Sequence, residues 1–149
     1  MEVAFTKQAH PRHFPPWVAR VGKARIEGSH LGCRPVDHLP HDVVTFVVER
    51  ELGLTDGFFA TVAAGGTFRS MRKRRHAAGK AVIARNRGGI DAAEVIANRH
   101  WAEWLHGRPT PCAAALDRAL AAWRATPPGA TLTISWDLTP QRAPKRRRR

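Results

Sequence analysis

The sequence predicts an α+β fold, in which a small antiparallel or mixed sheet carries four or five helices packed on it. Segments that alternate apolar and polar residues stand near both ends of the chain, helical patterns fill the middle, and Gly- or Pro-containing turns separate them. The length of 149 residues is typical of one domain. We expect one α+β domain over residues 1–138 and a disordered basic tail over residues 139–149. The strands are predicted near residues 2–8, 17–27 and 131–138.

The first predicted strand places Val3 and Phe5 on one face. In the second segment, Gly22 and Lys23 fit a two-residue hairpin turn, and one long strand is the alternative. Residues 131–138 alternate strictly between apolar and polar side chains, which predicts a half-buried strand. We expect this last strand to return to the sheet formed by the N-terminal ones.

The first helix is predicted over residues 41–53, because Pro stands before it and Gly ends it, although its composition also suits a strand. Asp42, Thr45 and Glu49 recur at helical spacing and predict one polar stripe on an otherwise buried helix. Asp56 is the expected N-cap of a short helix that follows.

The next helix is expected to begin at Ser70, to carry many basic residues and to reach about Arg87. Adjacent glycines commonly end a helix, so the pair Gly88 and Gly89 predicts its end. Asp91 is then the expected N-cap of a separate helix, with Ile90 and Val95 packed as a hydrophobic staple. The apolar stripe predicted for that helix consists of Ala97, Trp101, Trp104 and Leu105.

The last helix is predicted from Thr110 to Ala125, with Thr110 as N-cap and Pro111 as its first residue. Leu116, Leu120 and Trp123 form its apolar stripe.

The positive charge is concentrated in two segments. The net charge is +13, yet residues 57–90 hold eight Lys or Arg and no acid, and residues 139–149 hold six and no acid. The rest of the chain is almost neutral, with the remaining 11 basic and all 12 acidic residues. This pattern is typical of contact with a polyanion. The predicted nucleic-acid-binding residues are Arg69, Arg72, Lys73, Arg74, Arg75, Lys80, Arg85, Arg87, Lys145, Arg146, Arg147, Arg148 and Arg149.

These observations favour a non-enzymatic domain that binds DNA, RNA or another polyanion mainly through phosphates. Asn86 is the only amide side chain of the basic helix, so we expect weak sequence preference. The simplest alternative is a basic surface that is only solvated. A further alternative is binding to an anionic lipid surface, but the apolar face of the basic helix is thin for that role. The second hypothesis is an interaction or regulatory module for an acidic protein, and the third is a metal-dependent enzyme.

His30, Cys33, His38 and His41 are all metal-ligand types at short spacing. They lack the paired cysteines of a zinc ribbon, so we predict no metal site. We also predict no cofactor and no catalytic residue. Two cysteines make no disulfide framework, and no stretch is apolar and long enough for a signal peptide or a membrane span. These features predict a cytoplasmic protein.

The stretch LPHDVVTFVVERELGLTDGFFATVAAGGTF at residues 39–68 resembles a segment of small uncharacterised actinobacterial proteins. In these an L-P-H-D helix leads to a V-E-x-E-L-G-L turn and then to a G-F-F…A-A-G segment. The resemblance covers about a fifth of the chain and implies a cytoplasmic single-domain protein with no known activity. That pattern often has His where this chain has Thr45, which weakens a metal interpretation of the helix.

Overall fold

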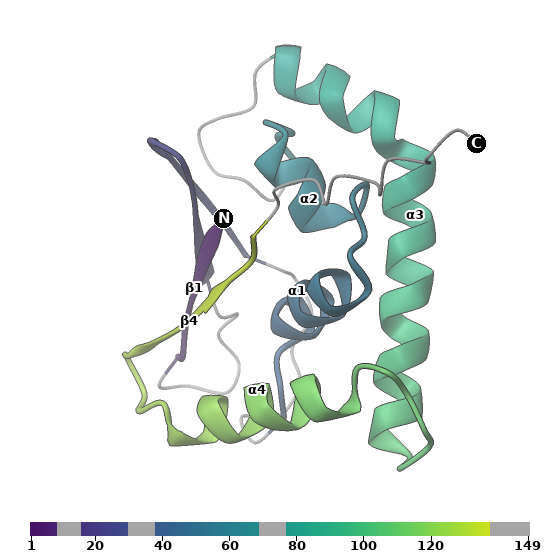
Figure 1. Ribbon diagram of the computed structural model, residues 1–149. Helices are drawn as coiled ribbons and strands as arrows, with labels where there is room; N and C mark the ends of the chain where they lie inside the picture. The colour runs from purple at the N-terminus through teal and green to yellow at the C-terminus, as the bar shows by residue number, and fades with distance from the viewer. Residues whose placement is uncertain (9–15, 30–37, 69–76, 138–149) are drawn as a thin grey trace, which may run out of the picture.

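The computed structural model describes residues 1–8, 16–29, 38–68 and 77–137. The fold is α+β, as predicted: one antiparallel sheet of four strands, in the order β3-β2-β1-β4, carries the helices of the described residues (Figure 1). The strands are β1 (Glu2–Thr6), β2 (Pro16–Val21), β3 (Ala24–Ser29) and β4 (Thr131–Ser135). The helices are α1 (His41–Leu52), α2 (Phe58–Ala63), α3 (Ala77–Leu105) and α4 (Ala113–Ala125).

The sheet joins the two ends of the sequence. β1 lies between β2 and β4, so that Val3 pairs with Ala19 on one side and with Ile134 on the other. Of the two possibilities for the second segment, the hairpin is correct, and Gly22 adopts a φ of 55° at its turn. The predicted return of the last strand to the N-terminal strands is confirmed.

Helix α1 lies at the centre of the helical layer, between the sheet and α3 (Figure 1). Every residue from Asp42 to Glu49 is buried, so the predicted polar stripe lies inside the protein. Phe46 of α1 packs edge-to-face on Phe5 of the sheet at 5.9 Å and on Phe59 of α2 at 5.1 Å between ring centroids. Such contacts add to the burial of apolar area that stabilises the fold.

The prediction of two helices separated at Gly88 and Gly89 was wrong, because α3 runs through both glycines for 29 residues. Figure 1 shows its N-terminal part inclined to the remainder, and a Gly pair is a common place for such a bend. Asp91 is therefore not an N-cap, and Val95, the expected staple residue, is 69% exposed.

Close packing explains why glycine is tolerated inside α3. A Cβ at Gly79 would lie 2.2 Å from the hydroxyl oxygen of Thr67, and one at Gly89 would lie 2.4 Å from a carboxylate oxygen of Asp56. The loops before and after α2 thus approach the helix where it has no side chains. Tertiary contacts of this kind outweigh the cost of glycine in a helix, about 1 kcal/mol per residue.

The inward face of α3 is continuous across the glycine pair. Residues that are buried or half-buried recur every three or four positions along the whole helix, which keeps one face toward the core. They are Gly79, Ile83, Asn86, Ile90, Ala93, Ala97 and Trp101.

The C-terminal end of α4 is bound by Lys7, the residue that follows β1. The Lys7 ammonium group is nearly buried and donates to the carbonyl oxygens of Trp123 at 2.8 Å and Arg124 at 3.4 Å. A cation at the C-terminal end of a helix interacts favourably with its unpaired carbonyls. This contact joins the C-terminal end of α4 to the C-terminal end of β1.

Candidate nucleic-acid interface

The structure describes three of the predicted phosphate-binding residues, and all three lie exposed on the N-terminal part of α3. They are Lys80, Arg85 and Arg87. The other ten lie outside the described residues: Arg69, Arg72, Lys73, Arg74, Arg75, Lys145, Arg146, Arg147, Arg148 and Arg149.

The solvent-exposed positions of α3 between residues 77 and 90 carry only Lys, Arg, Ala or Gly. We call this surface the basic face; besides its three cations it consists of Ala77, Ala78, Ala81, Ala84 and Gly88. Small side chains between long cationic ones let the helix backbone approach another surface closely. Guanidinium and ammonium groups can then reach past them to phosphate oxygens.

The opposite side of the same stretch docks on α2 and the loop that follows it. Thr67 donates its backbone N–H to the carbonyl of Gly79 at 3.3 Å, and Asn86 donates its amide Nδ2 to Thr61 Oγ1 at 3.3 Å. Asn86, the single amide considered for base recognition, thus anchors the helix. The docking fixes which side of α3 faces outward.

Among the residues that the structure describes, one carboxylate forms an ion pair with the basic face. The Arg87 guanidinium lies 3.9 Å from Asp91, and both side chains are more than two-thirds exposed, so this pair contributes at most about 1 kcal/mol. Within the described part of the chain, neither Lys80 nor Arg85 forms an ion pair. These cations are therefore available to an external anion.

The order of charges along α3 does not stabilise the helix itself. The first turn contains no acid and the last turn contains no base, whereas a helix dipole is stabilised by the opposite arrangement. The acids of α3, Asp91, Glu94 and Glu103, all follow the basic stretch. Helix stability therefore does not account for the cations.

Two of the four metal-ligand candidates are described, and they serve different contacts. His38 is exposed, whereas His41 begins α1 and lies 3.2 Å from Glu94 and 3.8 Å from Asp42. These carboxylates raise the pKa of His41 to about 9, Asp42 contributing most. Among the described residues no three His, Cys, Asp or Glu side chains form a metal cluster. His30 and Cys33 lie outside the described residues.

Glu49 is a further titratable group of α1, and it caps α2. Its carboxylate oxygens accept the backbone N–H groups of Phe58 at 2.6 Å and Phe59 at 3.0 Å. The predicted cap at Asp56 is thus replaced by a side chain that is fully buried. Burial raises the pKa of Glu49 to about 7, although the hydrogen bonds from α2 oppose this rise.

The side chains around His100 resemble a catalytic arrangement, but the ring proton lies on the wrong nitrogen for catalysis. Its Nε2 lies 3.1 Å from the guanidinium of Arg99, which can only donate, so we assign the ring proton to Nδ1. Nδ1 lies 2.8 Å from the hydroxyl of Thr110 and 3.1 Å from Glu103. A protonated Nδ1 cannot accept the hydroxyl proton of Thr110, so the ring does not activate Thr110 as a nucleophile. Burial also raises the pKa of the neighbouring Cys112 thiol above its usual range.

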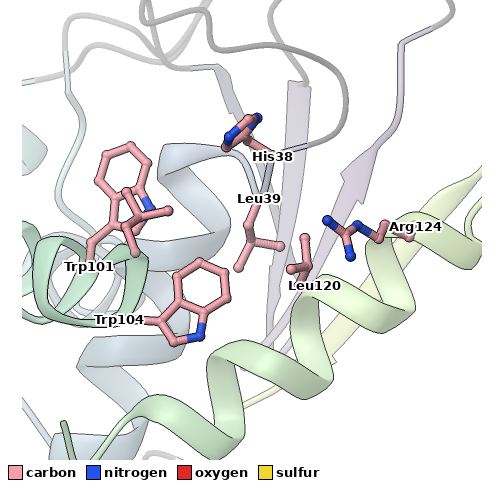
Figure 2. A pocket seen from close by; sticks show the side chains of 7 residues that line it. His38, Leu39, Trp101, Trp104, Leu120 and Arg124 are labelled. Atoms are coloured by element: carbon pink, nitrogen blue, oxygen red, sulfur yellow. The ribbon is translucent and has the colours of Figure 1, made fainter. Parts of the chain in front are cut away.

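Sequence reasoning missed a cavity of about 250 Å³ at the other end of α3. Its apolar walls are Leu39, Trp101, Trp104, Leu105 and Leu120. Its polar lining comes from His38 and Arg124, and Figure 2 shows the Arg124 guanidinium pointing from α4 toward Leu39 and Leu120. One signal was available in the sequence, since the apolar stripe of α3 continues beyond Trp101 to Leu105, which is 42% exposed.

None of the helices in the described ranges is both long and apolar enough to cross a membrane. No protein-family model matches the chain, and no match is found among curated proteins or solved structures. The fold and the charge distribution therefore define the class, an α+β protein with one strongly basic helical face.

Proposed function

We propose that this chain binds nucleic acid, DNA or RNA, through the phosphate backbone, using the basic face of α3. The observation that carries the proposal is the composition of this face, where only cations and very small side chains are exposed. Residues 69–76, directly before α3 in the chain, add five further cations and no acid. Residues 145–149 supply five more.

The contacts available on this surface are to phosphates rather than to bases. Arg and Lys neutralise phosphates and release counterions, which gives affinity with little dependence on sequence. The one amide of the described stretch, Asn86, is engaged with Thr61. We therefore expect similar affinity for unrelated sequences.

The test is the dependence of affinity on salt, measured with the full chain on a short DNA duplex and on the RNA duplex of the same sequence. With about eight phosphates contacted, the slope of log K against log salt on DNA is about −7. Replacing Lys80, Arg85 and Arg87 together by Ala should reduce the slope by about 3. Replacing Arg72, Lys73, Arg74 and Arg75 should reduce it further.

A charge-matched control separates the basic face from general attraction. Arg20, Lys23 and Arg118 are also exposed but lie on the sheet, its hairpin turn and α4. Changing these three to Ala removes the same charge and should leave the slope nearly unchanged. Equal effects of the two triple variants would contradict the proposed surface. A purified chain that binds neither duplex, and instead copurifies at high salt with an acidic protein, would contradict nucleic-acid binding itself.

A further inference from the structure

The cavity between the C-terminal part of α3, α4 and the residues His38 and Leu39, which precede α1, is separate from the basic face. Its lining combines two indole rings and three leucines with one guanidinium and one imidazole. Ligand sites commonly have this composition, mostly apolar with a few polar groups that fix orientation. A volume of about 250 Å³ suits a small molecule rather than a protein segment of several residues.

The walls of the cavity are held in place before any ligand enters. The indole Nε1 of Trp104 donates to the carboxylate of Asp117 at 2.8 Å, which fixes the ring against α4. Trp101 is 6% exposed and contacts the ring of His41 edge-on at 5.6 Å between centroids. Little side-chain freedom is therefore lost when an apolar group fills the space.

The Arg124 guanidinium gives the cavity lining a positive charge. Arg124 is exposed on α4, and its guanidinium points over the leucine side chains toward the cavity in Figure 2. Within the described ranges this guanidinium forms no ion pair with a carboxylate. A guanidinium beside apolar walls matches a carboxylate, to which it donates in a bidentate manner.

We propose that this cavity binds a small amphipathic carboxylate, with its apolar body between Trp101, Trp104 and Leu120 and its acid group on Arg124. The inference does not depend on nucleic-acid binding, because the residues of the cavity and of the basic face do not overlap.

Three probes with the same apolar body test the proposal: 4-phenylbutyrate, the corresponding alcohol and the corresponding amine. They are titrated into the full chain labelled with ¹⁵N, and the indole N–H signals are followed. The acid should bind about tenfold more tightly than the alcohol, because hydrogen bonds between charged groups contribute more to affinity than neutral ones. The amine should bind most weakly, because it carries the same charge as Arg124. The signals of Trp101 and Trp104 should move, and that of Trp17, buried between β2 and the rings of Phe58 and Phe59, should not.

Arg124→Gln should reduce the affinity of the acid to that of the alcohol and leave the alcohol unchanged. Arg118→Gln on the same helix is the matched control, since it removes the same charge from an exposed residue outside the cavity. The proposal fails if the acid and the alcohol bind alike to the unaltered chain, if Arg118→Gln acts as strongly as Arg124→Gln, or if no probe binds. The duplex-binding slope is measured separately, so failure here leaves the proposed function standing.

Discussion

Glu49 should make the protein less stable as the pH rises through neutrality. Its folded-state pKa of about 7 lies above the ordinary value of 4.5, because burial disfavours the charged carboxylate. The folded state therefore binds the proton more tightly than the unfolded state. The resulting stabilisation is complete below about pH 4.5 and is lost as the pH rises through about 7.

The size of this effect follows from the two pKa values. One pKa unit corresponds to about 1.4 kcal/mol, so the whole difference is about 3 kcal/mol, of which about 2 kcal/mol falls between roughly pH 5.5 and pH 8.5. The assay is urea unfolding at these two pH values for the unaltered chain and for Glu49→Gln. The variant is neutral at both pH values, so it should lack this part of the pH dependence.

Comparison of the two proteins cancels the pH dependence of all other groups, including that of the many basic residues. Glu51→Gln, on the exposed side of the same helix, is the control and should keep the pH dependence of the unaltered chain. If Glu49→Gln and the unaltered chain lost stability in parallel, the carboxyl would not titrate in this range. Burial would then not raise the pKa of Glu49 to about 7.

Three further predictions concern stability measured by denaturant unfolding. Gly79→Ala should destabilise the protein, because its Cβ would lie 2.2 Å from Thr67. Gly88→Ala should stabilise the protein by about 1 kcal/mol, because nothing lies within 4 Å of its Cβ. A change of the same sign in both variants would contradict the packing of α3. Lys7→Met should cost about 1–2 kcal/mol by removing the ammonium group that donates to the carbonyls of Trp123 and Arg124 at the end of α4, and an unchanged midpoint would exclude this account. His41, whose pKa is raised to about 9, stabilises the fold fully below its ordinary value of 6.5 and less as the pH rises through 9. His41→Gln should therefore cost roughly 2 kcal/mol at about pH 7 and little at about pH 10, and an equal loss at both would refute the ion pairs.

Local patterns were sufficient where local physics decides the structure. The alternation from Thr131 onward predicted β4, and a Gly suited to positive φ at Gly22 predicted the hairpin. The Gly at the end of α1 also adopts the left-handed conformation, with φ 63° at Gly53. Each of these features depends on a few neighbouring residues.

Contacts distant in sequence decided what local patterns missed. The glycine pair predicted a helix end, but Asp56 approaches Gly89 from another loop and the helix continues. Glu49 occupied a position expected on a polar stripe, and only the position of α2 shows that it is a cap.

The acid-free stretch that includes Lys80 was visible in the sequence, but its outward orientation depends on the docking of the opposite side. The cavity at Arg124 combines α3, α4 and the segment that precedes α1, and no single segment of the sequence predicts it.

The unbroken inward face of α3 has a consequence for changes in chain length. Each residue turns an α-helix by about 100°, so inserting one residue near Ile90 would rotate Gly79 and Ile83 away from α2 if Ala97 and Trp101 stayed in place. The two halves would compete for the core, and one would have to detach. A deletion at this point would have the same effect, which makes the middle of α3 far less tolerant of length variation than the turn at Gly22.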